Sequence, residues 1–116
     1  MINEFLAKHF ARDAERQSRP PIVCKSGLSL SVQAGEGLYC EPRATFRPGA
    51  TQSYTHVEIG FPNQKVEEFL EYADYIDDDD PEIYAYVPVG VLEKVIESHG
   101  GIDEKKMYTN RVIDGM

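Results

Sequence analysis

The chain has 116 residues, the length of one domain, and its hydrophobic content of 41% is too high for a globally disordered protein. Its apolar runs are too short to cross a membrane, and charged residues interrupt the first ten positions, so neither a transmembrane helix nor a secretory signal is expected. We therefore expect one cytoplasmic domain spanning residues 1–116, without a membrane partner.

The amino-terminal segment favours a helix. Apolar residues recur at helical spacing from Ile2, and the pattern extends to Arg16, ahead of Pro20 and Pro21, which a helix does not accommodate. We assign residues 1–17 to this helix, residues 28–102 to the core of the domain, and residues 103–116 to a polar tail.

Two segments alternate polar and apolar residues, which is the period of a strand with one buried face. The first covers residues 28–36, where Leu28, Leu30 and Val32 alternate with polar side chains. The second covers residues 54–62 and divides into an apolar face and a polar face: Thr55, Val57, Ile59 and Phe61 against Tyr54, His56 and Glu58.

A short amphipathic helix is predicted next. Val66, Phe69, Leu70 and Ala73 recur at the spacing of one helix face, with acidic residues between them.

A third strand and a last helix complete the pattern. Residues 83–89 alternate so that Tyr84 and Tyr86 share the polar face, and Pro88 restricts this strand to an edge or an end. Helical spacing then continues to His99, and the Gly100–Gly101 pair that follows is typical of a glycine C-cap.

These elements predict an α+β fold, with a small, mainly antiparallel sheet of three to four strands and two to three helices packed on it. Edge strands of such a sheet leave room for a homodimer.

The second half of the chain is strongly acidic. The formal net charge is −8, and the stretch from Val66 to Glu93 holds ten acidic residues and no lysine or arginine. Such a segment repels phosphate backbones, so direct nucleic-acid binding is not expected, and it attracts basic proteins. Interleaved tyrosines supply contact area at low entropic cost. The expected partner-binding residues are Glu67, Glu68, Glu71, Asp74, Tyr75, Asp77, Asp78, Asp79, Asp80, Glu82, Tyr84 and Tyr86. The alternative is a charged loop that only keeps the protein soluble.

Metal and cofactor sites are not expected. An EF-hand counted from Asp77 places Glu82 where glycine is required and Pro88 where glutamate is required. Cys24, Cys40 and the three histidines show no zinc-ligand spacing.

Two other functions stay open. A nucleotide-like small ligand would bind the polar sheet face at Tyr54, His56, Glu58, Tyr84 and Tyr86. A thiol enzyme would use Cys40 as nucleophile with His56 and Glu58, although nothing in the sequence near Cys40 activates it. No hydrolase, P-loop or Rossmann motif is present, so an enzyme is not the favoured reading.

Three segments carry a resemblance to a known family: SVQAGEGLYCEPR, YTHVEIGFP and YAYVPVGVLEKVIESHGGI. In this order they resemble a family of small uncharacterised proteins encoded by bacteriophages and prophages. The likeness covers Leu30 to Ile102, with Gly35 where the family has serine, and brings no catalytic motif. It implies an accessory protein that acts on host machinery, as anti-CRISPR and other counter-defence proteins do. We therefore expect a non-enzymatic inhibitor of a basic, nucleic-acid-handling host protein, located in the host cytoplasm.

Overall fold

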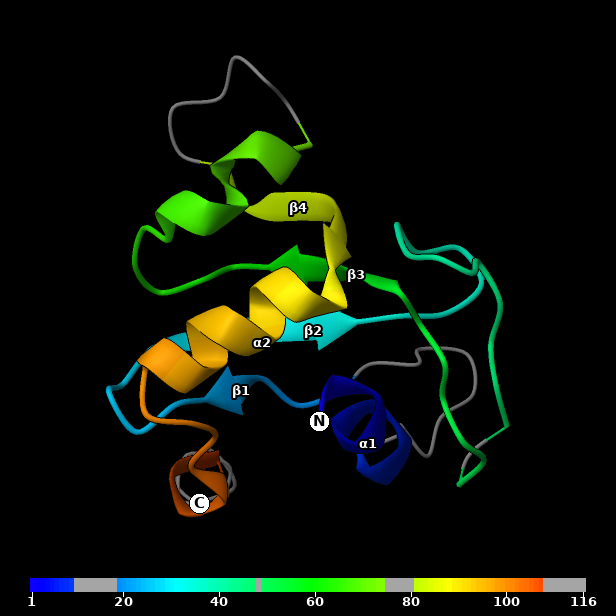
Figure 1. Cartoon of the computed structure of the whole chain (residues 1–116), viewed down its shortest axis with the longest axis horizontal. Coiled ribbons are helices and arrows are strands. Elements are labelled where there is room, and N and C mark those ends of the chain that lie inside the picture. Colours follow the sequence, from blue (N-terminus) through cyan, green and yellow to red (C-terminus); the bar gives the residue numbers. More distant parts are fainter. Residues whose placement is uncertain (10–18, 48, 75–80, 108–116) are drawn as a thin grey trace, which may run out of the picture.

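A four-stranded antiparallel sheet, with strand order β1-β2-β3-β4, forms the centre of a computed structural model that describes residues 1–9, 19–47, 49–74 and 81–107 (Figure 1). In chain order the elements are α1 (Ile2–Lys8), β1 (Ile22–Val23), β2 (Ser29–Gln33), β3 (His56–Gly60), the 3-10 helix η1 (Glu67–Tyr72), β4 (Ile83–Pro88) and α2 (Val89–Ser98). The helix α2 crosses one face of the sheet, and η1 lies beside β4, at the end of the sheet away from β1 (Figure 1). The predicted α+β fold is confirmed. No helix in the described ranges is long and apolar enough to span a membrane.

The sheet buries one face, as the alternation in β2 and β3 predicts. Val32 pairs with Ile59 in antiparallel register, and both side chains are fully buried. They share one hydrophobic core with Leu92 and Ile96 of α2 and with Leu6 of α1. Because hydrophobic burial drives folding, this common core holds the helices on the sheet.

An irregularity between β3 and β4 overturns the predicted orientation of Tyr84. Val57 pairs with Val87 and Ile59 with Tyr84, so Ala85 and Tyr86 together face the single residue Glu58. This is the geometry of a β-bulge, and Tyr86 occupies it with a φ of 52°. The extra residue lets Tyr84 and Val87 both point into the core. Tyr84 is only 2% exposed and does not share an outward face with Tyr86, contrary to the sequence prediction.

The predicted amphipathic helix is a 3-10 helix. With three residues per turn, the side chains on one face are three apart, and Val66 and Phe69 are the ones that are buried. Leu70, which an α-helix would turn inward, is 37% exposed. The Phe69 ring packs on Tyr84, with centroids 5.7 Å apart.

The two helices differ in how fully they match the sequence pattern. The helix predicted over residues 1–17 is observed from Ile2 to Lys8, and residues 10–17 lie outside the described ranges. The last helix ends as predicted, because Gly100 and Gly101 have φ values of 88° and 87°, and Gly101 donates its backbone N–H to the carbonyl of Ile96 at 2.9 Å.

Arg19 is a buried connection between α1 and β2 that the sequence did not indicate. Its side chain is 2% exposed and donates from Nε to the carbonyl of Leu6 at 2.9 Å and from Nη1 to that of Ala34 at 2.8 Å. Burial lowers the pKa of its guanidinium. A buried charge is stabilised by such bonds to backbone carbonyls.

Both edges of the sheet are partly covered by other segments. At the β1 edge, Asp103 donates its N–H to the carbonyl of Val23 at 2.7 Å, and Cys24 forms a bridge with Ile102. At the β4 edge, Asp74 donates to Ile83 at 3.0 Å and Tyr86 donates to Tyr39 at 3.1 Å. Backbone groups at both edges therefore already have partners within the described part of the chain.

The 3-10 geometry of η1 predicts that neighbouring residues contribute unequally to stability. Phe69→Ala removes a fully buried ring and should lower the free energy of unfolding by about 3–5 kcal/mol. Leu70→Ala, its matched control, should cost less than about 1 kcal/mol because the side chain is partly exposed. Urea denaturation of both variants measures the difference, and similar losses would show that η1 packs as an α-helix.

Candidate functional site

The face of the sheet opposite α2 carries polar side chains, but several of them already bind one another. Gln33 donates from Nε2 to Ser31 Oγ at 3.0 Å and to the carbonyl of Arg19 at 2.9 Å. Its Oε1 accepts the Arg19 backbone N–H at 2.9 Å. These residues therefore fasten the chain at Arg19 to the sheet and leave little free hydrogen-bonding capacity.

The predicted small-ligand surface is not assembled as expected. His56, Glu58 and Tyr86 are partly exposed, whereas Tyr54 and Tyr84 are each 2% exposed and belong to the core. Tyr54 precedes β3, and the bend at Thr55 interrupts the alternation on which its placement depended. Its hydroxyl donates to the carbonyl of Ala44 at 2.6 Å instead. The two buried tyrosines leave the sheet face without the aromatic pair that would sandwich a base.

Glu58, on this face, has a raised pKa. Burial raises the pKa of its carboxyl group, and the negative charge of Asp74 raises it further, while a hydrogen bond from the backbone of Tyr39 lowers it. Tyr39 itself packs on Tyr86, with ring centroids 5.9 Å apart. Glu58, Tyr39 and Tyr86 therefore form a small group of side chains around the β-bulge.

The thiol-enzyme hypothesis does not fit the position of Cys40. Its side chain is fully buried, and its Sγ lies 3.3 Å from the carbonyls of Gly35 and Pro42. Burial raises the pKa of the thiol, which disfavours the nucleophilic thiolate. His56 binds Thr55 through Nδ1, at 2.8 Å from its Oγ1. Neither half of a thiol–imidazole pair is therefore arranged for catalysis.

Metal ligands are not grouped in the described part of the chain. No set of three or more histidine, cysteine, aspartate or glutamate side chains converges there. Asp77, Asp78, Asp79 and Asp80 lie outside the described ranges, as does Tyr75.

The fold brings the remaining predicted acidic residues to one edge. Glu67, Glu68 and Glu71 are exposed on η1, and Ala73 at the end of this segment pairs with Tyr84. This pairing sets the chain on either side of residues 75–80 next to each other, so Asp74 and Glu82, both exposed, flank the same connection. We call Glu67, Glu68, Glu71, Asp74 and Glu82 the acidic edge.

Exposed apolar side chains lie beside the acidic edge, and the sequence pattern misplaced them. Phe61, assigned to the buried face, is 63% exposed with a φ of 51°, because the chain leaves the strand at this residue. Pro62 directly after it was the signal that the alternation ends there. Pro62, Leu70, Pro81 and Tyr84 line a depression of about 270 Å³, which Asn63, Gln64 and Lys65 complete. We call it the Leu70 depression.

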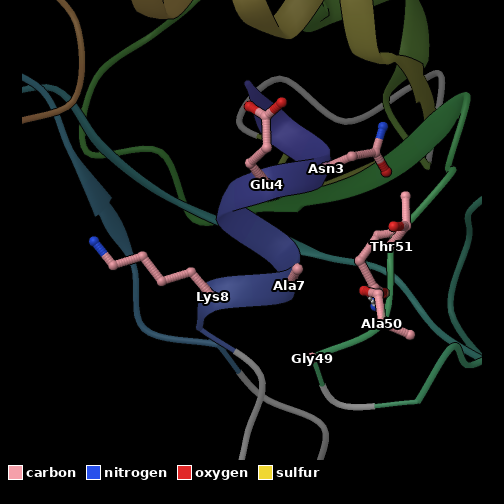
Figure 2. A pocket seen from close by; sticks show the side chains of 8 residues that line it. Asn3, Glu4, Ala7, Lys8, Gly49, Ala50 and Thr51 are labelled. Atoms are coloured by element: carbon pink, nitrogen blue, oxygen red, sulfur yellow. Dashed lines mark hydrogen bonds between the residues drawn. The ribbon is translucent and has the colours of Figure 1, made fainter.

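A larger cavity of about 440 Å³ lies between α1 and residues 49–52 (Figure 2). Figure 2 shows Lys8 extending away from the loop, where its Nζ binds Glu104 at 2.7 Å. Asn3 uses both atoms of its amide on the backbone of Tyr54, and Glu4 binds the terminal amine at 2.8 Å. The polar groups of Asn3, Glu4 and Lys8 on the α1 wall are therefore bonded within the protein itself.

Comparison with protein-family models, with curated proteins and with solved structures found no match.

The burial of Cys40 predicts slow modification. In the folded protein at neutral pH, Cys40 and the equally buried Cys24 should react with a disulfide reagent far more slowly than in the unfolded chain, since burial raises the pKa of both thiols. The reaction is followed by absorbance, with Cys40→Ser and Cys24→Ser assigning each phase. Rapid labelling of Cys40 would restore the thiol-enzyme hypothesis.

The raised pKa of Glu58 predicts a pH-dependent stability. The carboxyl group of Glu58 has its ordinary pKa of 4.5 in the unfolded chain and binds its proton more tightly in the folded state. The free energy of unfolding therefore falls as the pH rises from 4.5 through the raised pKa of the folded state. Glu58→Gln keeps an acceptor for the Tyr39 backbone and abolishes the titration. Its stability relative to the wild type should increase as the pH rises above 4.5, measured by urea denaturation. Glu97→Gln on the exposed side of α2 controls for removal of a surface charge, and parallel pH profiles for Glu58→Gln and the wild type would contradict the prediction.

Proposed function

We propose that this chain is a non-enzymatic accessory protein of phage or prophage type that binds and inhibits a basic, nucleic-acid-handling host protein, in the manner of an anti-CRISPR protein. The observation that carries the proposal is the acidic edge: Glu67, Glu68, Glu71, Asp74 and Glu82 are all exposed. The phage setting rests on the family resemblance of the sequence.

Electrostatics supports this function. Exposed carboxylates along η1 and at the start of β4 form a run of negative charge without any lysine or arginine between Val66 and Glu93. A negative run of this kind imitates a phosphate backbone and accelerates association with a basic groove. The attraction is screened by salt over about 10 Å at 0.1 M, so binding should weaken as the salt concentration rises.

The structural context supports a binding role over a merely solubilising one. Charge that only keeps a protein soluble has no need of neighbouring apolar groups, whereas interfaces combine an apolar centre with a polar rim. Phe61 is 63% exposed and Leu70 37% exposed beside the acidic edge. The arrangement has the composition of an interface.

Neutralising the acidic edge should weaken binding without unfolding the protein. The edge variant, with Glu67→Gln, Glu71→Gln and Glu82→Gln, removes three exposed charges. In capture experiments from a bacterial lysate at low salt, followed by identification of the bound protein, it should lose at least roughly tenfold in affinity, in line with several surface charges acting together.

A matched control separates this effect from net charge. The remote variant, with Glu36→Gln, Glu41→Gln and Glu97→Gln, removes the same charge from other exposed positions and should bind like the wild type. Equal loss in both variants would reduce the acidic edge to a contribution to overall charge. Replacing Asp77, Asp78, Asp79 and Asp80 with serine should act in the same direction as the edge variant, and undiminished binding would remove the mimicry of a phosphate backbone.

A further inference from the structure

We propose that the Leu70 depression and the ring of Phe61 form the anchor site for an arginine side chain of the basic partner. The inference rests on the proposed function, because it names the group through which the partner is held. It depends on three observations: the size and lining of the depression, the backbone conformation of Phe61, and the charge around both.

The depression has the size of a side chain. Its volume of about 270 Å³ lies below the range of about 300–1,000 Å³ that is usual for small-molecule sites. Its lining is mixed and more polar than apolar, and Pro62, Leu70 and Pro81 supply the apolar part, which suits the aliphatic stem of a long side chain.

The walls are held in place before any partner arrives. Asn63 accepts the backbone N–H of Ser29 through Oδ1 and donates from Nδ2 to the carbonyl of Gly27, both at 2.9 Å. On the opposite side, Tyr84 is fixed by its contact with Phe69. A preformed site loses less entropy on binding than one that must first be ordered.

The backbone conformation of Phe61 indicates a functional role. The fold holds this residue in a strained conformation although its ring is not buried. A non-glycine residue with φ near +50° is strained, and an exposed ring gains little burial to offset that strain. Phe61 is held there by its backbone N–H, which donates to the carbonyl of Glu82 at 2.7 Å. Strain without a packing benefit is typical of contact residues.

Arginine fits this surface better than lysine does. A guanidinium group stacks on an aromatic ring, binds a carboxylate through two parallel hydrogen bonds, and is more weakly hydrated than an ammonium group. Phe61 precedes Pro62 of the lining and donates its backbone N–H to Glu82, so it supplies the ring, and Glu82 and Glu71 directly follow the lining residues Pro81 and Leu70 in the chain. Lys65 is the basic residue of the lining, and its charge opposes the incoming cation.

The experiment uses two fluorescent peptides of equal charge, one alternating arginine with glycine and the other alternating lysine with glycine. Fluorescence anisotropy at about 0.01 M and 0.15 M salt measures their affinity for the full chain. The arginine peptide should bind roughly two- to fivefold more tightly than the lysine peptide, the gain typical of a cation–π contact at an exposed site.

Three substitutions locate the anchor. Phe61→Asn places a residue that tolerates positive φ, so it should keep or raise the melting temperature while abolishing the preference for arginine. Leu70→Ser should likewise weaken binding of the arginine peptide and reduce its advantage over the lysine peptide. Lys65→Gln should tighten both peptides roughly twofold by removing a repulsion. Tyr39→Ser is the control for Phe61, since it removes another exposed aromatic ring away from the depression and should leave the preference intact.

The outcomes distinguish the anchor from the function on which it rests. If the edge variant weakens both peptides but arginine and lysine bind equally, or if Phe61→Asn and Leu70→Ser leave the preference unchanged, the anchor is overturned and the acidic interface stands. If neither peptide binds at low salt, or if the edge and remote variants behave alike, both proposals fail. A loss of arginine preference in Phe61→Asn and Leu70→Ser, but not in Tyr39→Ser, supports the anchor.

Discussion

The β-bulge opposite Glu58 is the constraint on which the arrangement of the acidic half depends. By adding one residue between Tyr84 and Val87, it turns both side chains into the core, while Tyr86 remains beside Tyr39 on the other face. The inward ring of Tyr84 gives Phe69 its packing partner, and Phe69 in turn fixes η1 along β4. With a regular ladder, Tyr84 would point away from Phe69, and the carboxylates of η1 would have no fixed relation to the sheet.

Charge and packing act in opposite directions at this edge of the molecule. Neighbouring carboxylates repel one another and destabilise the compact state. Within residues 66–74, the buried side chains that oppose this repulsion are Val66 and Phe69. Packing in the hydrophobic core, at some distance from the charges, therefore stabilises the acidic edge. A segment that combines exposed acids, an exposed leucine and a strained phenylalanine is locally inconsistent with maximal stability, and such inconsistencies are expected where a protein makes contacts with others.

The elements with a regular polar–apolar pattern were predicted correctly from the sequence. The orientation of side chains was predicted wrongly where that pattern is interrupted. The alternation in β2 and the helical spacing of α2 with its Gly100–Gly101 cap follow from burial on one face, and both are observed. Tyr84 was misplaced because a bulge depends on the pairing partner, which local alternation does not reveal. Leu70 was misplaced because the spacing of Val66 and Phe69 fits both an α-helix and a 3-10 helix, and only an α-helix would turn Leu70 inward with them. At the candidate site, the exposed acids of η1 were predicted correctly as surface residues, whereas the depression arises from segments that meet only in the folded chain.

The covered β1 edge has a consequence for how the protein is made. Val23 of β1 accepts the N–H of Asp103, and the adjoining Cys24 forms a bridge with Ile102, about 80 residues later in the chain. During synthesis, β1 and β2 emerge from the ribosome long before these partners do, and contacts between residues so distant in sequence form slowly. The β1 edge is therefore covered only after residues 102 and 103 have been made, and the nascent chain exposes this edge until then.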